Sequence, residues 1–286
     1  MPQEEDLGRW YRDKYRQEYK RSSRPHRRHV LRAARLARER YAWMLGAVPP
    51  EIWASRKGLC EALDIGCSGG EFLHLLESVG VSALGIEPHQ GYAFHARDTL
   101  GLKVLCGTLA ESLPMLQDRR FDLLTMFHVL EHLTQPRQTL EALRRLLHDD
   151  GLLYLEVPNA AKIGAPNNMF FRAHTLYFAK PCLVALVQAA GYAVVADQFE
   201  RNENLRLLLR KSVALPSPWH FDDDLIKAQQ RRRWLPYLWS SLLGGRVGKR
   251  LAARLEEKQS ASRFASDSDL LQATYRGLSE PGSKGR

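Results

Sequence analysis

The sequence predicts an α/β fold with a mostly parallel sheet of seven strands, the last two antiparallel, and helical extensions at both ends. Short apolar runs alternate with amphipathic segments from about residue 60 to residue 191, which is typical of right-handed βαβ units. The last two apolar runs are too close together for a crossover helix, so we expect them to pair antiparallel. A glycine-rich turn separates the first strand from the first helix of the series.

Each predicted strand is a short run of apolar residues. We expect strands at residues 62–66, 82–88, 103–107, 121–128, 151–159, 192–200 and 205–211. Apolar residues recur at helical spacing between them, which predicts helices over residues 72–79, 89–101, 140–147 and 181–191. Gly101 is the predicted end of the second helix, and the turn at residues 149–151 is the predicted end of the third.

Both flanks of this central unit are helical in pattern. We divide the chain into an N-terminal extension at residues 1–58, a central domain at 59–212 and a C-terminal extension at 213–286. A helix is predicted to begin near Ser23 and to end at Pro49. The C-terminal extension is basic and amphipathic, and it ends in a tail rich in Ser, Asp, Gly and Lys for which we expect disorder.

The net charge of +10 comes from the two flanks. Residues 1–60 hold 15 Lys and Arg against 7 Asp and Glu, residues 226–286 hold 13 against 5, and residues 61–225 hold 14 against 20. Basic flanks can attract a nucleic acid or an anionic membrane surface, or can be solvated helix faces. There is no signal-peptide core, no apolar run of roughly 18 residues and no close cysteine pair, so we expect a cytoplasmic protein with reduced thiols.

The glycine-rich turn lies in the segment ALDIGCSGGEFL, residues 62–73. Glycines let a backbone approach a ligand, and the start of the following helix offers free N–H groups. A dinucleotide fingerprint would have glycine at positions 66, 68 and 71, but this chain has Gly66, Ser68 and Glu71. Because Glu71 would repel a pyrophosphate, the turn is better suited to a nucleoside ligand without phosphates.

Two further acids favour a ligand with a positive charge and a ribose. Asp64 precedes the turn and could pair with a cationic group. Glu87 ends the second strand, where nucleotide-binding βαβ units have an acid that binds ribose hydroxyls. S-adenosylmethionine has an ammonium, a sulfonium and a ribose but no phosphate, so it fits both acids. Taken singly, Asp64 could be a buried hydrogen-bonded acid and Glu87 a surface acid at a strand end.

Four segments in order resemble the class I S-adenosylmethionine-dependent methyltransferases: ALDIGCSGGEFL, LGIEP, FDLLTMFHVLEHL and GLLYLEVPN. The chain is most similar to the branch with HVLEHL after the fourth strand and VPN after the fifth, and its segment HTLYFAKPCLVALVQAAGY resembles that branch too. The resemblance covers roughly residues 60–211. It implies a Rossmann-like seven-stranded sheet, S-adenosylmethionine as the cofactor and methyltransferase activity.

The resemblance also implies which residues bind the cofactor. These are Asp64, Gly66, Ser68, Gly70, Glu87, Leu109 and Phe127. The turn would hold the methionine part and Glu87 the ribose. Ser68 replaces the commoner central glycine of the family. Thr108 replaces an acid that often lies near the adenine amine, so Thr108 or a backbone group of Leu109 would have to make that contact.

The end of the fourth strand has the candidates for proton transfer. His128 and His132 are candidate general bases because histidine titrates near neutral pH, and Glu131 shares their face at helical spacing. His174 could close over them from the next loop. Glu131 and His132 resemble the pair that holds a divalent ion in some quinone and RNA-end O-methyltransferases, but His128 stands where those enzymes have a further acid, so no metal is predicted. Glu131 and His132 could instead only cap the turn and hold that loop.

We expect the acceptor to be an oxygen or nitrogen of a small molecule, a saccharide or a lipid-linked compound. Four aromatic residues could stack on it or anchor the loop after the fifth strand: Phe170, Phe171, Tyr177 and Phe178. The segment 231–255 could lie at the inner face of a membrane, or pack on the core or a second subunit. The alternatives are an RNA methyltransferase, suggested by the basic flanks, and a non-catalytic scaffold that binds S-adenosylmethionine.

Overall fold

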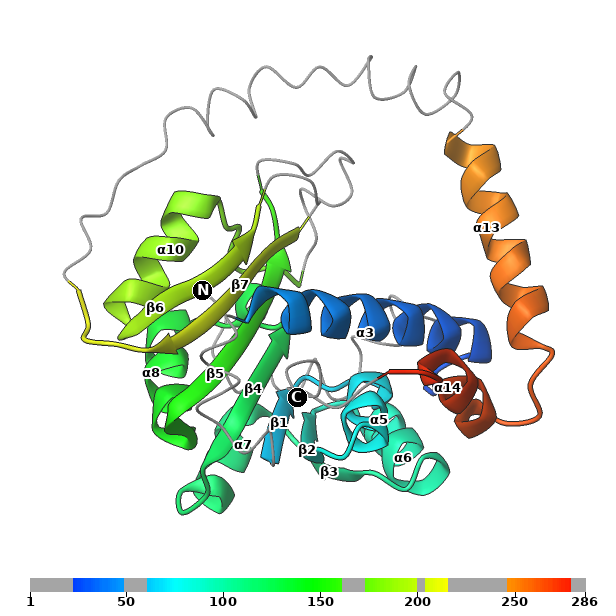
Figure 1. The fold of residues 1–286 in the computed structure, drawn as a ribbon, viewed down its shortest axis with the longest axis horizontal. Helices are drawn as coiled ribbons and strands as arrows, with labels where there is room; N and C mark the ends of the chain where they lie inside the picture. Colours follow the sequence, from blue (N-terminus) through cyan, green and yellow to red (C-terminus); the bar gives the residue numbers. More distant parts are fainter. Residues whose placement is uncertain (1–22, 49–60, 161–172, 200–203, 216–245, 279–286) are drawn as a thin grey trace.

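A seven-stranded sheet forms the centre of the protein, in the order β3-β2-β1-β4-β5-β7-β6 (Figure 1). The strands are β1 (Glu61–Ile65), β2 (Ser82–Glu87), β3 (Lys103–Cys106), β4 (Phe121–Phe127), β5 (Leu147–Pro158), β6 (Tyr192–Gln198) and β7 (Asn204–Lys211). Strands β1 to β5 pair in parallel, and β7 pairs antiparallel with both β5 and β6. The predicted fold is confirmed, and β7 lies between β5 and β6, antiparallel to both.

The computed structural model describes residues 23–48, 61–160, 173–199, 204–215 and 246–278. The expectations for Phe170, Phe171 and residues 231–245 of the amphipathic segment therefore lie outside the described residues. Within the described part of the chain, none of the helices combines the length and the apolar character that a crossing of the membrane would need.

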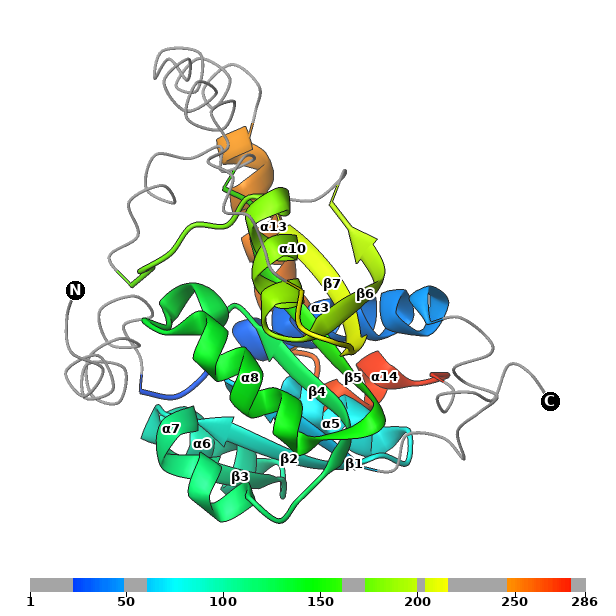
Figure 2. The same ribbon diagram turned by 90° about the vertical axis from the view of Figure 1, so that its left-hand side faces the viewer.

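Helices cover both faces of the sheet (Figures 1 and 2). The first face is covered by α3 (Arg27–Ala47), α5 (Glu71–Ser78), α6 (Gln90–Phe94) and α14 (Asp267–Tyr275). The second face is covered by α8 (Pro136–Leu146) and α10 (Lys180–Ala189). The remaining helical elements are η1 (His95–Thr99), α7 (Leu109–Ser112), η2 (Leu113–Leu116), η3 (Leu130–His132) and α13 (Arg246–Ala261). Successive strand residues alternate between the two cores, as Leu123 and Leu124 do in β4.

Helix α3 lies across the first face because its apolar residues recur at helical spacing. All five of the residues that follow are buried: Val30, Ala34, Ala37, Tyr41 and Met44. Their burial fixes the helix on the sheet and directs Arg40 toward the carboxyl ends of the strands, where it contacts Glu156 of β5.

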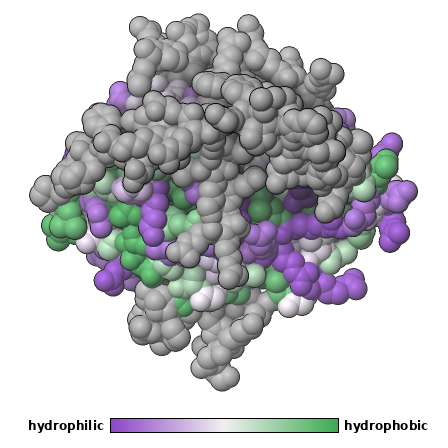
Figure 3. Space-filling view, turned by 90° about the horizontal axis from the view of Figure 1, so that it is seen from above, coloured by the Kyte–Doolittle hydropathy of each residue, from purple (hydrophilic) through white to green (hydrophobic). Residues whose placement is uncertain are grey.

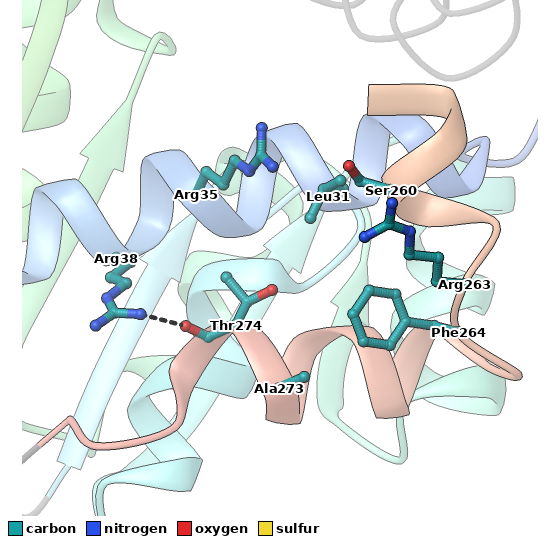
Figure 4. Close-up of a pocket in the computed structure, with 8 residues that line it drawn as sticks. All are labelled: Leu31, Arg35, Arg38, Ser260, Arg263, Phe264, Ala273 and Thr274. Atoms are coloured by element: carbon teal, nitrogen blue, oxygen red, sulfur yellow. Dashed lines mark hydrogen bonds between the residues drawn. The ribbon is translucent and has the colours of Figure 1, made fainter. Parts of the chain in front are cut away.

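Helix α14 stands where the sequence predicted a disordered tail. Ser266 and Asp269 form a reciprocal capping box at its start, and Leu270, Leu271 and Tyr275 are buried against the first core. Only three apolar residues anchor this helix in a polar segment, which explains why the composition suggested disorder. A hollow of about 370 Å³ lies between α3, α13 and α14. Arg38 donates to the Thr274 carbonyl there at 2.9 Å, and Figure 4 shows this bond among the residues that line the hollow.

Two further elements differ in detail from the sequence prediction. The predicted turn at 149–151 is an irregularity inside β5: Phe121 pairs with Leu147, but Leu123 pairs with Leu152, so the extra residues bulge out of the ladder. The predicted helix at 89–101 is α6 followed by a π-helical turn, η1, which places His95 behind the glycine-rich turn. Gly101 ends this stretch with a φ of 72°, as predicted.

A buried ion network joins α3 to the sheet. The Glu156 carboxylate accepts hydrogen bonds from Arg40 Nη2 at 2.6 Å, from Arg206 Nε at 2.7 Å and from Asn204 Nδ2 at 3.0 Å. Arg206 also forms an ion pair with Glu39 of α3 at 2.9 Å. Charges removed from water in this way are tolerated only when they are paired.

We predict that Arg40→Met destabilises the fold by about 3 kcal/mol, since it leaves Glu156 buried with one cation fewer. Urea denaturation would measure the change. Arg137→Met is the matched control, because Arg137 forms an exposed pair with Glu141 within α8 and its loss should cost about 0.5 kcal/mol or less. Equal losses in the two variants would contradict a structural role for the Arg40–Glu156 pair.

Candidate active site

The turn between β1 and α5 has a backbone conformation that requires small residues. Gly66, Ser68 and Gly70 have φ values of 75°, 55° and 89°, in the left-handed region. Space restricts the two glycines as well, because a Cβ at Gly66 would overlap Val129 and a Cβ at Gly70 would lie 2.6 Å from Leu102 Cδ1. The turn therefore forms a bare backbone cradle at the carboxyl end of β1.

Glu87 fixes this cradle from the neighbouring strand. One oxygen of its carboxylate accepts from the Ser68 backbone N–H at 2.9 Å, and the other accepts from the His89 N–H at 3.0 Å. The side chain is buried rather than on the surface, which rules out the reading of Glu87 as a surface acid. A carboxylate oxygen can accept two hydrogen bonds, so Glu87 keeps acceptor capacity beside the turn.

Buried carboxylates surround the cradle. Asp64 accepts a hydrogen bond from the Thr125 hydroxyl at 2.6 Å, and Glu71 opens α5. Burial raises the pKa of Asp64 to about 7, against the hydrogen bond from Thr125 that lowers it, and Glu87 and Glu71 add to the rise. Such a site favours a cation and disfavours a phosphate.

The polar side chain that follows β3 is engaged in hydrogen bonds with a neighbouring residue of the protein. Thr108 caps α7: its hydroxyl donates to Glu111 Oε2 at 3.0 Å and accepts from the Glu111 N–H at 3.3 Å. Of the two alternatives for the adenine contact, the Thr108 hydroxyl is therefore already engaged. Leu109 is the first residue of α7, where the backbone N–H has no acceptor within the helix.

Phe127 belongs to an aromatic cluster at the end of β4. Its ring centroid lies 5.0 Å from that of Phe72 in α5 and 4.8 Å from that of Tyr154 in β5, and the Arg40 guanidinium lies 4.1 Å over its ring. Phe127 thus links the first helix after the cradle to the buried ion network.

His128 lies between two carboxylates, in a left-handed conformation with a φ of 56°. Its Nε2 is 3.1 Å from Glu156 Oε1, and its Nδ1 is 3.3 Å from Glu131 Oε1. Burial alone would lower the pKa of His128, but the two carboxylates outweigh it and raise the pKa to about 9. Although 36% of the side chain is exposed, both nitrogens face acceptors, so the ring is an imidazolium at neutral pH.

Glu131, His132 and His174 form a cluster in which three potential ligand atoms lie within 4.8 Å of one another. The Nε2 atoms of both histidines are 3.9 Å from Glu131 Oε1. His132 Nδ1 lies 2.8 Å from the Ala173 carbonyl, which can only accept, so Nδ1 bears a hydrogen and Nε2 is the ring nitrogen that can gain or lose a proton. The expectation that His174 closes over this turn is confirmed.

The charge state of this cluster suits a cation. Burial, then the proximity of His132, lowers the pKa of His174 to about 4, so its ring is neutral at pH 7. Glu131 is 1% exposed, and neither of its oxygens accepts a well-directed hydrogen bond. One carboxylate and two imidazoles could hold a divalent metal ion, which binds an imidazole in its neutral form.

Of the aromatic residues expected near the acceptor, the structure describes two. Phe178 is buried in the second core, so it anchors the loop. Tyr177 is 38% exposed, and its ring centroid lies 5.7 Å from that of His174. Tyr177 therefore keeps the position from which it could contact an acceptor.

Sequence reasoning missed Glu156, Arg40 and His95. Glu156 is an acid within the apolar run GLLYLEVPN, the same signal that singled out Asp64 in ALDIG, so it could have been found. Arg40 was one of several arginines in a helical pattern. His95 had no signal, because its partners lie on distant parts of the chain.

Comparison with known proteins gives one family match. Residues 16–197 match a family described as a methyltransferase domain. The ubiquinone biosynthesis O-methyltransferase of Methylococcus capsulatus is 34% identical over 104 residues, which are 35% of this chain and 44% of that protein. The protein of the same name from Glaesserella parasuis is 28% identical over 107 residues, 35% of this chain and 45% of that protein. The matched segment thus spans less than half the length of these relatives.

Solved structures with a similar chain path include two SAM-dependent methyltransferases. A SAM-dependent methyltransferase from Archaeoglobus fulgidus has 17% identity and a TM-score of 0.47, covering 54% of this chain and 87% of that one. A SAM-dependent methyltransferase from Thermotoga maritima, described as a possible histamine N-methyltransferase, has 20% identity and a TM-score of 0.46, covering 65% of this chain and 100% of that one.

We predict that His128 titrates well above the ordinary histidine value of 6.5 and that Glu131→Gln lowers its pKa. Because the folded-state pKa is raised, the stabilisation from this histidine is complete below about pH 6.5 and is lost as the pH rises through about 9. NMR titration of labelled histidine rings would measure both. Glu141→Gln, an exposed acid on α8, is the control and should leave the His128 titration unchanged.

Proposed function

Since the chain belongs to the methyltransferase domain family, we propose that it is an S-adenosylmethionine-dependent enzyme that transfers a methyl group to an oxygen or nitrogen of a small-molecule acceptor. The observation that carries this proposal is the cradle: a left-handed turn held by Glu87 among buried carboxylates. Cofactors with phosphates would meet negative charge there, whereas a sulfonium and an ammonium would be attracted.

The residues around the cradle fit this cofactor, which supplies a methyl group on a positively charged sulfur. The backbone from Gly66 to Gly70 would hold the methionine part. Glu87 would use its remaining acceptor capacity for the ribose hydroxyls, and the first N–H of α7, at Leu109, would contact the adenine. Asp64, behind the turn, would attract the positive charge of the cofactor when its carboxyl group is ionised. Phe127, at the carboxyl end of β4, would form the wall on the histidine side.

His132 and His128 would have different roles in removing the proton of the acceptor. Methyl transfer requires alignment of the acceptor, exclusion of water and a route for the proton of the acceptor. His132 would be the better general base, because Ala173 holds its Nδ1–H and orients the ring so that Nε2 is the nitrogen that takes the proton. His128 is already protonated at neutral pH, so its role would be a fixed positive charge that stabilises an acceptor oxygen as it loses its proton.

The identity of the methyl acceptor is a further part of the proposal. Both curated relatives are named for O-methylation in ubiquinone biosynthesis, which favours an oxygen of a small molecule over a nitrogen. A saccharide or a lipid-linked acceptor remains a hypothesis from the sequence, as does the membrane contact of residues 231–255. No observation on the described residues favours RNA as the substrate.

We predict that the protein binds S-adenosylmethionine in isothermal titration calorimetry and does not bind NAD⁺. Glu87→Ala should weaken the binding by about 1–3 kcal/mol, since it removes the acceptor for the ribose and the anchor of the Ser68 N–H. Glu77→Ala, at an exposed position of α5, should bind as the wild type does. Binding of NAD⁺ in place of S-adenosylmethionine would overturn the proposed function.

We also predict that the affinity for S-adenosylmethionine falls below pH 7, by up to about tenfold per pH unit. The pKa of Asp64 is about 7, so acid removes the charge that favours the cationic cofactor. In Asp64→Asn the amide oxygen can still accept from the Thr125 hydroxyl, but this pH dependence should disappear. Calorimetry between about pH 5.5 and pH 8 would compare the two proteins, and equal slopes would exclude Asp64 as the group responsible.

A further inference from the structure

The cradle is contacted from behind by a histidine that also contacts the C-terminal helix. His95 is buried in the π-helical turn η1. Its Nδ1 lies 3.1 Å from the Gly69 carbonyl oxygen, and its Nε2 lies 3.0 Å from Asp267 Oδ2 at the start of α14. His95 thus connects the turn to a residue 172 positions away in the sequence.

The partners of His95 define its protonation state. A backbone carbonyl and an ionised carboxylate can only accept hydrogen bonds, so both ring nitrogens must bear hydrogens and the ring is an imidazolium. Burial opposes the charge, but Asp267, the Gly69 carbonyl and the buried Glu71 outweigh it and raise the pKa of His95. The positively charged Arg27 pairs with the other oxygen of the same Asp267 carboxylate.

Arg27 and Tyr275 hold the two ends of α14 in place. The Arg27 side chain donates to Asp267 Oδ1 at 3.0 Å and to the Phe264 carbonyl at 2.8 Å, which ties the start of α14 to the start of α3. At the other end of α14, the Tyr275 hydroxyl donates to the Glu71 carbonyl at 2.7 Å, on the first residue of α5. Both ends of α14 therefore connect to the segment that forms the cradle.

The peptide between Gly69 and Gly70 needs such support. Two adjacent glycines give a peptide group the greatest freedom to rotate, because neither flank has a Cβ that restricts φ. Its N–H donates to the Cys67 carbonyl at 3.0 Å, and its carbonyl accepts from His95. Without His95, only one side of this peptide would be held.

We propose that His95 is a positioning residue for the cofactor cradle and that the docked C-terminal helix α14, acting through Asp267, sets the affinity for the cofactor. This inference rests on the proposed function, since the cradle is the proposed cofactor site. The C-terminal segment then acts as a support of the site from outside the sheet, and release of α14 loosens the turn and weakens binding.

The test compares three variants by calorimetry with S-adenosylmethionine at pH 7, at a temperature where circular dichroism reports an intact fold. Asp267→Ala removes the partner of His95 and should weaken binding roughly 3- to 30-fold, the range of couplings transmitted through packed contacts. Glu257→Ala is the matched control, because it removes another acid that joins α3 to a C-terminal helix, through Arg32, without reaching the cradle; its binding should stay within about twofold of wild type.

Asp267→Asn should restore binding. Its amide oxygen can accept from Arg27 while its NH₂ donates to a neutral His95, which still donates from Nδ1 to Gly69. In the wild type the link is complete below the pKa of His95 and is lost as the pH rises through it, so the affinity of the wild type relative to Asp267→Asn should fall at high pH. Asn could also replace a purely structural Asp267, but such a residue would not give this pH dependence.

Hydrogen exchange of the peptide around residues 66–72 gives a readout that needs no ligand. Exchange should accelerate in Asp267→Ala and in Tyr275→Phe, but not in Glu257→Ala. The inference would be overturned if Asp267→Ala had the same exchange rates and the same affinity for S-adenosylmethionine as the wild type. If the wild type binds no S-adenosylmethionine, the proposed function fails, while the exchange comparison still decides whether α14 supports the turn.

Discussion

The buried carboxylate of Glu156 is the constraint on which the rest of the site depends. An ionised acid inside an apolar strand is tolerated only with full compensation, and here Arg40, Arg206, Asn204 and His128 supply it from three separate segments of the chain. The same requirement therefore places α3 on the sheet, holds β7 next to β5 and fixes the histidine at the end of β4. Because the compensation is shared, the position of each partner depends on the others.

Helix α3 connects this ion network to the residues that support the glycine-rich turn. Arg40 binds Glu156 at the histidine end, while Arg27, about 20 Å away along the same helix, binds Asp267 and so supports His95 behind the cradle. A single rigid helix from the N-terminal flank thus spans both halves of the candidate site. The basic character of that flank suggested a nucleic acid or a membrane, but at these two positions the arginines form ion pairs with acids of the same chain.

Much of the fold could be predicted because its signals are local. The alternation of apolar runs, the glycine-rich turn and the acid at Glu87 depend on residues that are close in sequence, and the structure places each of them as strands, cradle and cradle anchor. The pairing of Arg40 with Glu156 and the support from α14 could not be predicted, since they join residues more than 100 positions apart and no periodicity records such pairs. The tail was misjudged for the same reason: α14 is stable through a few buried side chains and its contacts, and not through its composition.

The environments of the histidines decide which of them can take a proton. His128 and His174 lie on either side of Glu131, yet the pKa of His128 is raised to about 9 by two carboxylates, while burial and a neighbouring histidine lower that of His174 to about 4. Groups of the same chemical type whose pKa values are driven apart are suited to different roles. A base must be neutral at the working pH and keep an unshared lone pair, and His128 meets neither condition because both of its nitrogens face carboxylates and its pKa is about 9. His132 donates from Nδ1 to the Ala173 carbonyl, so Nε2 is the nitrogen that could take a proton, and of the two histidines proposed as general base it is the better placed.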